Sequence, residues 1–217
     1  MPEREPDADC PSPNGPLLET VPAGTISWRI HSARFGPAGF SPVPASDKRE
    51  SGRFDSIDGD YTYLYAGETR LTAFAETFLR GSTVMGSGVG ALPRVRLANL
   101  RLSRIETTDE LQLVSLVGGE ALRRIGQDAW LTACDESDYP ITRRWARAIR
   151  RWAPNAHGFV WLAKRDNRHR AYILFGDRGA DTLVRGEERM ALDTEEGELF
   201  ATKMLARLSV SVEAFVP

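Results

Sequence analysis

The chain has little cysteine, almost no net charge and no long apolar run. Its two cysteines, Cys10 and Cys134, lie far apart and form no Cys-x-x-Cys pattern. This usage argues against a disulfide framework and favours a reducing, cytoplasmic setting. The formal charge of −2 argues against bulk attraction to nucleic acid or to an anionic membrane. No stretch has the length and apolarity needed to cross a bilayer, and the N-terminus lacks a signal peptide's apolar core.

Sequence signatures of several common catalytic sites are also missing. The three histidines, His31, His157 and His169, are distant from one another and show no metal-ligand spacing. We therefore expect no bound metal. A phosphate-binding P-loop, a nucleophile elbow and a G-x-G-x-x-G dinucleotide fingerprint are all absent from the sequence. The missing fingerprint argues against a classical dehydrogenase.

What remains is a chain of single-domain size with an ordinary globular composition, 41% hydrophobic and 27% charged. Residues 1–24 hold six prolines and mixed charge without periodicity. We predict a flexible arm there and one domain over residues 25–217. Strand patterns are scattered irregularly between helix patterns, which predicts an α+β fold with a mixed or antiparallel sheet core and flanking helices.

Hydrophobic periodicity, together with prolines and glycines that begin or end elements, predicts where the helices and strands of this domain lie. A helix from Pro140 carries a basic face, read either as solvated or as a surface for an anionic partner. The glycine-rich segment 81–91 is expected to be a mobile loop rather than a phosphate cradle. Strands are expected at 25–32, 61–65, 95–105, 111–117, 158–163, 171–175 and 208–212, and further helices at 119–125 and 194–207. The basic face consists of Arg143, Arg144, Arg147, Arg150 and Arg151.

The most informative stretch is Ser51–Glu76. It predicts a loop carrying Arg53, then a strand with three tyrosines on one face, then a helix carrying Glu76. Thr69 is the expected N-cap, and apolar residues follow at helical spacing until Gly81. An arginine, a tyrosine and a carboxylate would thus lie on three neighbouring elements. A purely structural interpretation also fits, in which Arg53 is a loop arginine, Glu76 is solvated and the tyrosines pack across strands.

Three blocks of sequence, in order and at suitable spacing, resemble the RES domain family, which is named after an Arg, a Glu and a Ser. The first is Arg29 on an early strand, the second the Gly52-Arg53-Phe54 block, and the third runs from Tyr65 to Glu76. Further family-like stretches are 139–146, 157–163 and 174–178, so the resemblance covers about residues 25–180. The chain departs from the family pattern at Ala163, where the family's serine is expected.

This resemblance implies a fold similar to that of ADP-ribosyltransferases and an enzyme that consumes NAD as the toxin of an Xre–RES toxin–antitoxin pair. It implies Glu76 and Arg29 as catalytic residues, with Glu76 stabilising an oxocarbenium-like transition state. Arg29 and Arg53 would bind the phosphate or ribose groups of NAD, Tyr65 would stack on nicotinamide, and Ala163 would occupy the serine's place in the site. Expected partners are NAD and a helix-turn-helix antitoxin of the Xre type, with no direct contact to nucleic acid or membrane.

Three points stay open at the level of sequence. The acceptor of the ADP-ribosyl group can be inorganic phosphate as co-substrate, water or a macromolecule. The last would make the chain an ADP-ribosyltransferase rather than an NAD phosphorylase or glycohydrolase. Alternatively, Ala163 marks a non-catalytic NAD-binding module. Association with a second copy of the chain is likewise left open.

Overall fold

A computed structural model describes residues 5–47, 51–79 and 90–213, and ten strands and five α-helices lie within them. The strands are β1 (Leu18–Val21), β2 (Ile26–Ser32), β3 (Tyr63–Gly67), β4 (Gly90–Pro93), β5 (Leu100–Thr107), β6 (Leu111–Ser115), β7 (Gly158–Ala163), β8 (Asp166–Phe175), β9 (Val184–Ala191) and β10 (Val210–Glu213). The helices are α1 (Arg70–Phe78), α2 (Gly118–Arg124), α3 (Trp130–Ala133), α4 (Tyr139–Trp152) and α5 (Glu195–Ala206).

One large sheet organises the molecule. Its eight strands run in the order β1-β6-β7-β8-β3-β2-β5-β9, and every neighbouring pair is antiparallel except β6 and β7, which are parallel. The parallel pair requires a long crossover, which is provided by α2, α3 and α4. Strands β4 and β10 form a separate parallel pair. This architecture confirms the predicted α+β fold with a mixed, mostly antiparallel sheet.

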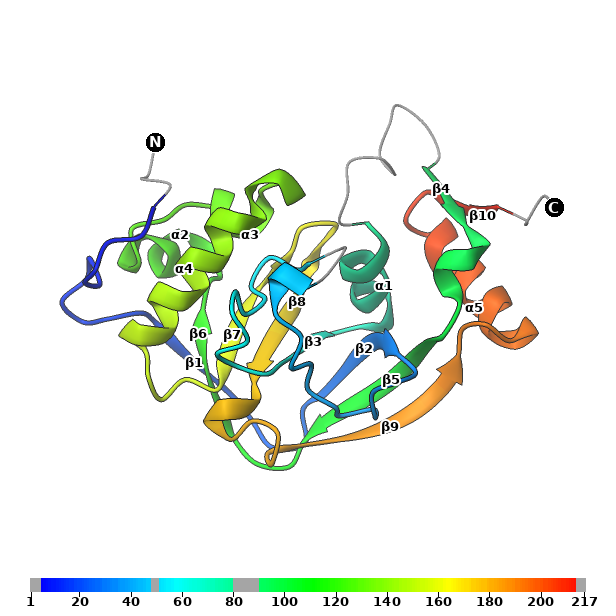
Figure 1. The fold of residues 1–217 in the computed structure, drawn as a ribbon, viewed down its shortest axis with the longest axis horizontal. Helices are drawn as coiled ribbons and strands as arrows, with labels where there is room; N and C mark the ends of the chain where they lie inside the picture. The colour runs from blue at the N-terminus through cyan, green and yellow to red at the C-terminus, as the bar shows by residue number, and fades with distance from the viewer. Residues whose placement is uncertain (1–4, 48–50, 80–89, 214–217) are drawn as a thin grey trace.

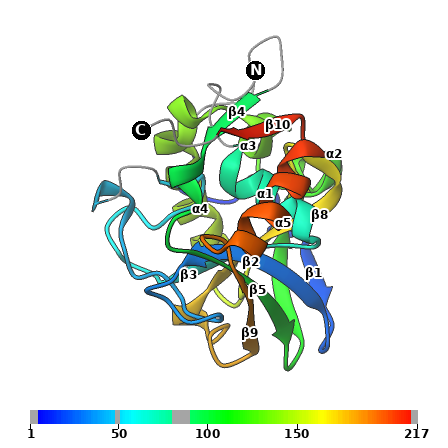
Figure 2. The same ribbon diagram turned by 90° about the vertical axis from the view of Figure 1, so that its right-hand side faces the viewer.

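The helices divide into three groups around the sheet. Figure 1 shows α2, α3 and α4 beside β6 and β7, α1 above the middle of the sheet, and α5 with β4 and β10 at the opposite end. Figure 2 shows that opposite end, where α5 lies in front with the β4–β10 pair above it and β2, β5 and β9 below it. The buried core is correspondingly divided, with one cluster under α3 and α4, one on the other sheet face, and one between α1, α5 and β2.

The sheet is weakly joined at its centre, between β2 and β3. These two strands share a single register pair, Trp28 with Gly67, whereas β2 pairs with β5 over seven residues and β3 with β8 over five. Helix α1 packs directly on Gly67, because a Cβ there would lie 2.8 Å from the backbone nitrogen of Ala73 and 2.8 Å from Cβ of Thr72. The absence of a side chain at Gly67 thus lets α1 lie against the point where the sheet divides.

Most elements with a strong local pattern were predicted correctly. Thr69 is the N-cap of α1, and its side chain accepts a hydrogen bond from the backbone N–H of Thr72. The tyrosines at 61, 63 and 65 lie on one face, with ring centroids 6.1 and 5.8 Å apart in sequence order. The predicted helices at 119–125, from Pro140 and at 194–207 correspond to α2, α4 and α5. The predicted helix end at Gly81 and most of the glycine-rich loop lie outside the described residues.

Three predictions need correction. Part of the arm assigned to residues 1–24 is a strand, because Leu18–Val21 pairs with β6 at the sheet edge. The predicted strand 95–105 begins only at Leu100, because Arg94–Leu97 forms a 3-10 helix. The basic face of α4 is not uniformly solvated. Arg150 is buried, with its guanidinium 3.9 Å from the ring centre of Tyr61 and 2.7 Å from a carboxylate oxygen of Asp177.

Candidate active site

A cleft opens where β2 and β3 separate, and it holds three of the predicted site residues. Arg29 comes from β2, Tyr65 from β3 and Glu76 from α1, and Trp161 of β7 completes the wall. The space not filled by atoms is about 300 Å³, part of it open to solvent. Because this volume includes space open to solvent, the enclosed part of the cleft is small and can contact only part of a larger ligand.

Arg29 supplies a buried positive charge to this cleft. Its side chain is 6% exposed, and its Nη1 donates to the backbone carbonyls of Pro37 (3.2 Å) and Gly39 (2.8 Å). Its Nε has no hydrogen-bond partner, and among the described residues no carboxylate pairs with it. Burial lowers the pKa of Arg29 to about 10. A buried cation without a counter-ion is costly, and an anionic ligand in the cleft would offset that cost.

The charge of Arg29 also acts on its neighbour along β2. Burial, followed by the charge of Arg29, lowers the pKa of His31 to about 4. His31 therefore carries no charge at neutral pH, and its Nε2 lies 2.8 Å from Oγ of Ser103. Because His31 is neutral, Arg29 is the charged side chain in this part of β2.

Glu76 is held against the cleft by the anchoring of α1. Thr72, one turn before Glu76, donates from its Oγ1 to Oδ2 of Asp166 at 2.6 Å. Asp166 begins β8, so this bond fixes the first turn of the helix to the turn between β7 and β8. Glu76 itself is half-buried and lines the cleft with Ala73 and Thr77. The predicted proximity of the carboxylate to Arg29 and Tyr65 in one cleft is therefore found.

The aromatic wall of the cleft consists of Tyr65 and Trp161. Their ring centroids lie 6.3 Å apart at an interplanar angle of 84°, and Phe54 packs edge-on against Trp161 at 5.3 Å. The hydroxyl of Tyr65 accepts a hydrogen bond from the backbone N–H of Phe54 at 3.0 Å. Trp161 was not predicted as a site residue. Its alternation with Phe159 and Ala163 on β7 was the available signal.

Arg53 does not line this cleft, contrary to its predicted role in direct substrate contact. The side chain is buried, and its Nη1 lies 3.3 Å from the carbonyl of Leu131 and 2.9 Å from Sγ of Cys134. The guanidinium also lies 4.9 Å from the ring centre of Tyr139. These contacts tie the 51–55 loop to α3 and α4. Arg53 therefore anchors the loop whose next residue, Phe54, contacts both aromatic residues of the cleft wall.

Ala163 also lies outside the cleft. It is fully buried in the core cluster under α3 and α4, at the end of β7. It borders a second pocket formed with α2 and α3. The site predicted from sequence thus divides into a cleft with Arg29, Tyr65 and Glu76, and two supporting or neighbouring positions, Arg53 and Ala163.

Within residues 5–47, 51–79 and 90–213, no group of three or more His, Cys, Asp or Glu side chains is arranged to hold a metal ion. In the same part of the chain, no helix combines the length and apolarity required to span a membrane.

The molecule is thus an α+β domain with a divided sheet. Its cleft is lined by an arginine, a glutamate and aromatic residues. The profile of the RES domain matches residues 26–193, so the chain belongs to the RES domain family. The match spans the cleft, the second pocket and every predicted site residue. Among curated proteins, none matches the chain.

A solved structure shares the fold. It is the crystal structure of the M. tuberculosis MbcT-MbcA toxin-antitoxin complex, which superposes with a TM-score of 0.57. The alignment covers 86% of this chain and 92% of the other, at 14% sequence identity. At that identity the likeness establishes the fold.

Proposed function

We propose that this chain is an NAD-degrading toxin that cleaves the bond between nicotinamide and ribose. The observation that carries the proposal is the cleft itself, in which a buried arginine, unpaired with any carboxylate of the described residues, lies with a glutamate and two aromatic rings. Family membership and the toxin–antitoxin context of the MbcT-MbcA structure support the same assignment. We also propose a cytoplasmic location, where NAD would be available to the chain.

Arg29 binds an anionic group of NAD in this proposal. The pyrophosphate and ribose oxygens of NAD are acceptors, and a planar guanidinium can donate two parallel hydrogen bonds to such a group. Because the site is buried, the attraction between opposite charges is screened less than in water. The ligand would in turn provide the counter-charge that Arg29 lacks among the described residues.

Glu76 acts on the transition state. When the C–N bond breaks, nicotinamide leaves with the bonding electron pair, and positive charge develops on the ribose ring. A carboxylate near that centre, or bonded to a ribose hydroxyl, stabilises the transition state more than the ground state. Tyr65 provides a ring face for nicotinamide, and Arg53 keeps the loop behind Tyr65 in place.

Nicotinamide release tests this function. Purified protein, free of any partner, is expected to release nicotinamide from NAD in the presence of a chelator, with the product resolved by chromatography. Assays with and without inorganic phosphate distinguish phosphorolysis from hydrolysis. Label transferred from NAD to protein or nucleic acid would instead identify an ADP-ribosyltransferase. No release by folded protein at high concentration would overturn the proposal, and ligand-induced stabilisation without release would identify a binding module.

Ala163 gives an independent prediction. Ala163→Ser is expected to lower the melting temperature and leave kcat for nicotinamide release unchanged, because its hydroxyl would be buried in an apolar cluster outside the cleft. A buried hydroxyl without a partner costs about 1–3 kcal/mol. Thermal unfolding and nicotinamide release measured on the same preparation check this. A higher kcat/KM at an unchanged melting temperature would instead restore the role of the family's serine to this position.

An NAD-degrading chain also requires a partner that silences it in its own cell. We propose a helix-turn-helix antitoxin of the Xre type, so that contact with DNA is indirect. Expression of the chain alone is expected to arrest growth of a bacterial host, and Glu76→Gln is expected to relieve the arrest. Harmless expression of folded, unmodified protein would remove the reason to expect an antitoxin.

A further inference from the structure

A second pocket lies beyond the carboxyl ends of the two parallel strands, β6 and β7. Its walls come from the segment after β6, from α2 and α3, and from the end of β7. The space not filled by atoms is about 990 Å³, part of it open to solvent. In open, mostly parallel α/β sheets, ligands bind beyond the carboxyl ends of the strands, and the parallel pair β6 and β7 gives this mostly antiparallel sheet a local arrangement of the same kind. In this domain, the crossover through α2, α3 and α4 departs at this place.

The pocket and the cleft are neighbours along one strand. Trp161 borders the cleft and Ala163 borders the pocket. Both belong to the same core cluster and are two positions apart on β7, which corresponds to about 7 Å. The enclosed part of the cleft is small, so a dinucleotide bound there would extend beyond it and could reach a second site.

The lining of the pocket has the chemistry of a nucleotide site. Leu116 and Leu122 give an apolar wall for a flat base. Gln127 and Asn167 add side-chain amides, the pairing of donor and acceptor that matches the edge of adenine, and Nε2 of Gln127 also donates to the carbonyl of Gly126 at 3.1 Å. Asp128 also lines the pocket and offers an acceptor for ribose hydroxyls.

Two cations complete the lining. Lys164 lies at the pocket edge with its Nζ 2.7 Å from a carboxylate oxygen of Asp135, so its charge is partly compensated. Arg123 is exposed on α2, and no described carboxylate pairs with it. Arg123 is therefore the side chain best suited to meet a phosphate group of a ligand in the pocket.

We propose that this second pocket binds the adenosine half of the dinucleotide whose nicotinamide half occupies the cleft. The inference rests on the proposed function for the choice of NAD as ligand. Base and ribose would lie between the leucines and the amides, and Arg123 would contact the adjacent phosphate. The pocket thereby determines specificity for dinucleotides over mononucleotides, and the cleft carries the chemistry.

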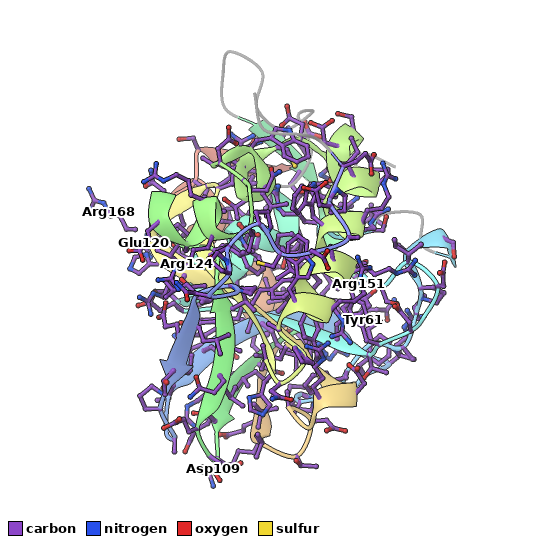
Figure 3. The ribbon with its side chains drawn as sticks, turned by 90° about the vertical axis from the view of Figure 1, so that its left-hand side faces the viewer. Tyr61, Asp109, Glu120, Arg124, Arg151 and Arg168 are labelled. Atoms are coloured by element: carbon purple, nitrogen blue, oxygen red, sulfur yellow. The ribbon has the colours of Figure 1, made fainter. Side chains whose placement is uncertain are left out.

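The test compares two substrates in one variant. Arg123→Glu is expected to raise KM for NAD about 10-fold or more, with kcat for nicotinamide release little changed. The same variant is expected to leave kcat/KM for nicotinamide mononucleotide, which lacks the adenosine half, unchanged. Ala133→Phe, which narrows the pocket from α3, is expected to act in the same way. Arg168→Glu is the matched control, because Arg168 projects from the body of the protein outside the pocket, on the side that carries Glu120 and Arg124 (Figure 3).

Direct titration with AMP separates this proposal from the proposed function. Binding of AMP that Arg123→Glu weakens at least about 10-fold, without any NAD cleavage by the unmodified protein, would support the pocket and overturn the enzymatic assignment. NAD cleavage with an unchanged KM in Arg123→Glu and Ala133→Phe would overturn the pocket and leave the enzymatic assignment intact. An equal loss of kcat/KM for NAD and for nicotinamide mononucleotide in Arg123→Glu would also overturn the adenosine assignment, because Arg123 would then act on a part that the two substrates share.

Discussion

Glu76→Gln is expected to lower kcat for nicotinamide release by at least about 100-fold and to leave the melting temperature close to that of the unmodified protein. The substitution keeps the size and shape of the side chain, replaces one acceptor oxygen with a donor NH2 group, and removes the charge that in the proposed function stabilises the developing oxocarbenium ion. Loss of one preorganised electrostatic group costs roughly 100- to 1,000-fold in other enzymes. Initial rates at saturating NAD, together with thermal unfolding, provide the measurement.

Glu196→Gln is the matched control for this substitution. Glu196 is exposed in the first turn of α5, away from the cleft, so its change to an amide is expected to alter neither kcat nor KM. A Glu76→Gln variant within a few-fold of the unmodified protein would return Glu76 to an ordinary helix-surface role.

Arg29→Met is expected to lower kcat/KM for NAD by about 100-fold or more without unfolding the protein. Methionine fills a similar volume and removes a buried charge that no described carboxylate offsets. Removing the charge also removes the free-energy cost of burying it. This gain offsets the loss of the hydrogen bonds to Pro37 and Gly39, so the melting temperature is expected to change little. Arg29→Lys is expected to recover only part of the activity, because an ammonium cannot bind an oxyanion in bidentate fashion.

The pKa of His31 provides an independent check that Arg29→Met has removed the charge beside it. The charge of Arg29 is one cause of the low pKa of His31, so this pKa is expected to rise from about 4 in the variant. An NMR titration of the imidazole measures the change. Arg104→Met is the control, since Arg104 lies on β5, pairs with Glu106 and does not line the cleft. Activity of Arg29→Met within a few-fold of the unmodified protein would contradict the assignment of Arg29 to the substrate.

Elements with local signals were predictable from the sequence. The alternating tyrosines, the cap at Thr69 and the proline at the start of α4 each act within one turn or one strand, and each is found in the structure. The proximity of Tyr65 and Glu76 was predictable because their strand and helix follow each other in the chain. In contrast, Arg53 of the same stretch does not line the cleft, and Arg29 was indicated only by the family resemblance. Their order and spacing matched the family pattern.

Features that depend on distant contacts were not predictable in this way. Strand β9 is rich in exposed charged residues and has no strand-like alternation, and its pairing with β5 defines it. Strand β1 is short and lies in a proline-rich segment, so its pairing with β6 was not evident. The side chain of Arg53 bonds to residues about 80 positions later, where no sequence pattern indicated a partner.

The single register pair between β2 and β3 has a consequence for how ligand binding and folding are coupled. Backbone hydrogen bonds make neighbouring strands cooperative, and here that ladder is almost interrupted between Arg29 on one side and Tyr65 on the other. A ligand that contacts both residues bridges the interruption and acts as a non-covalent cross-link within the sheet. Its binding free energy then stabilises the contact between the two halves of the sheet. The free energy of local opening between β2 and β3 is therefore expected to be higher when the cleft is occupied.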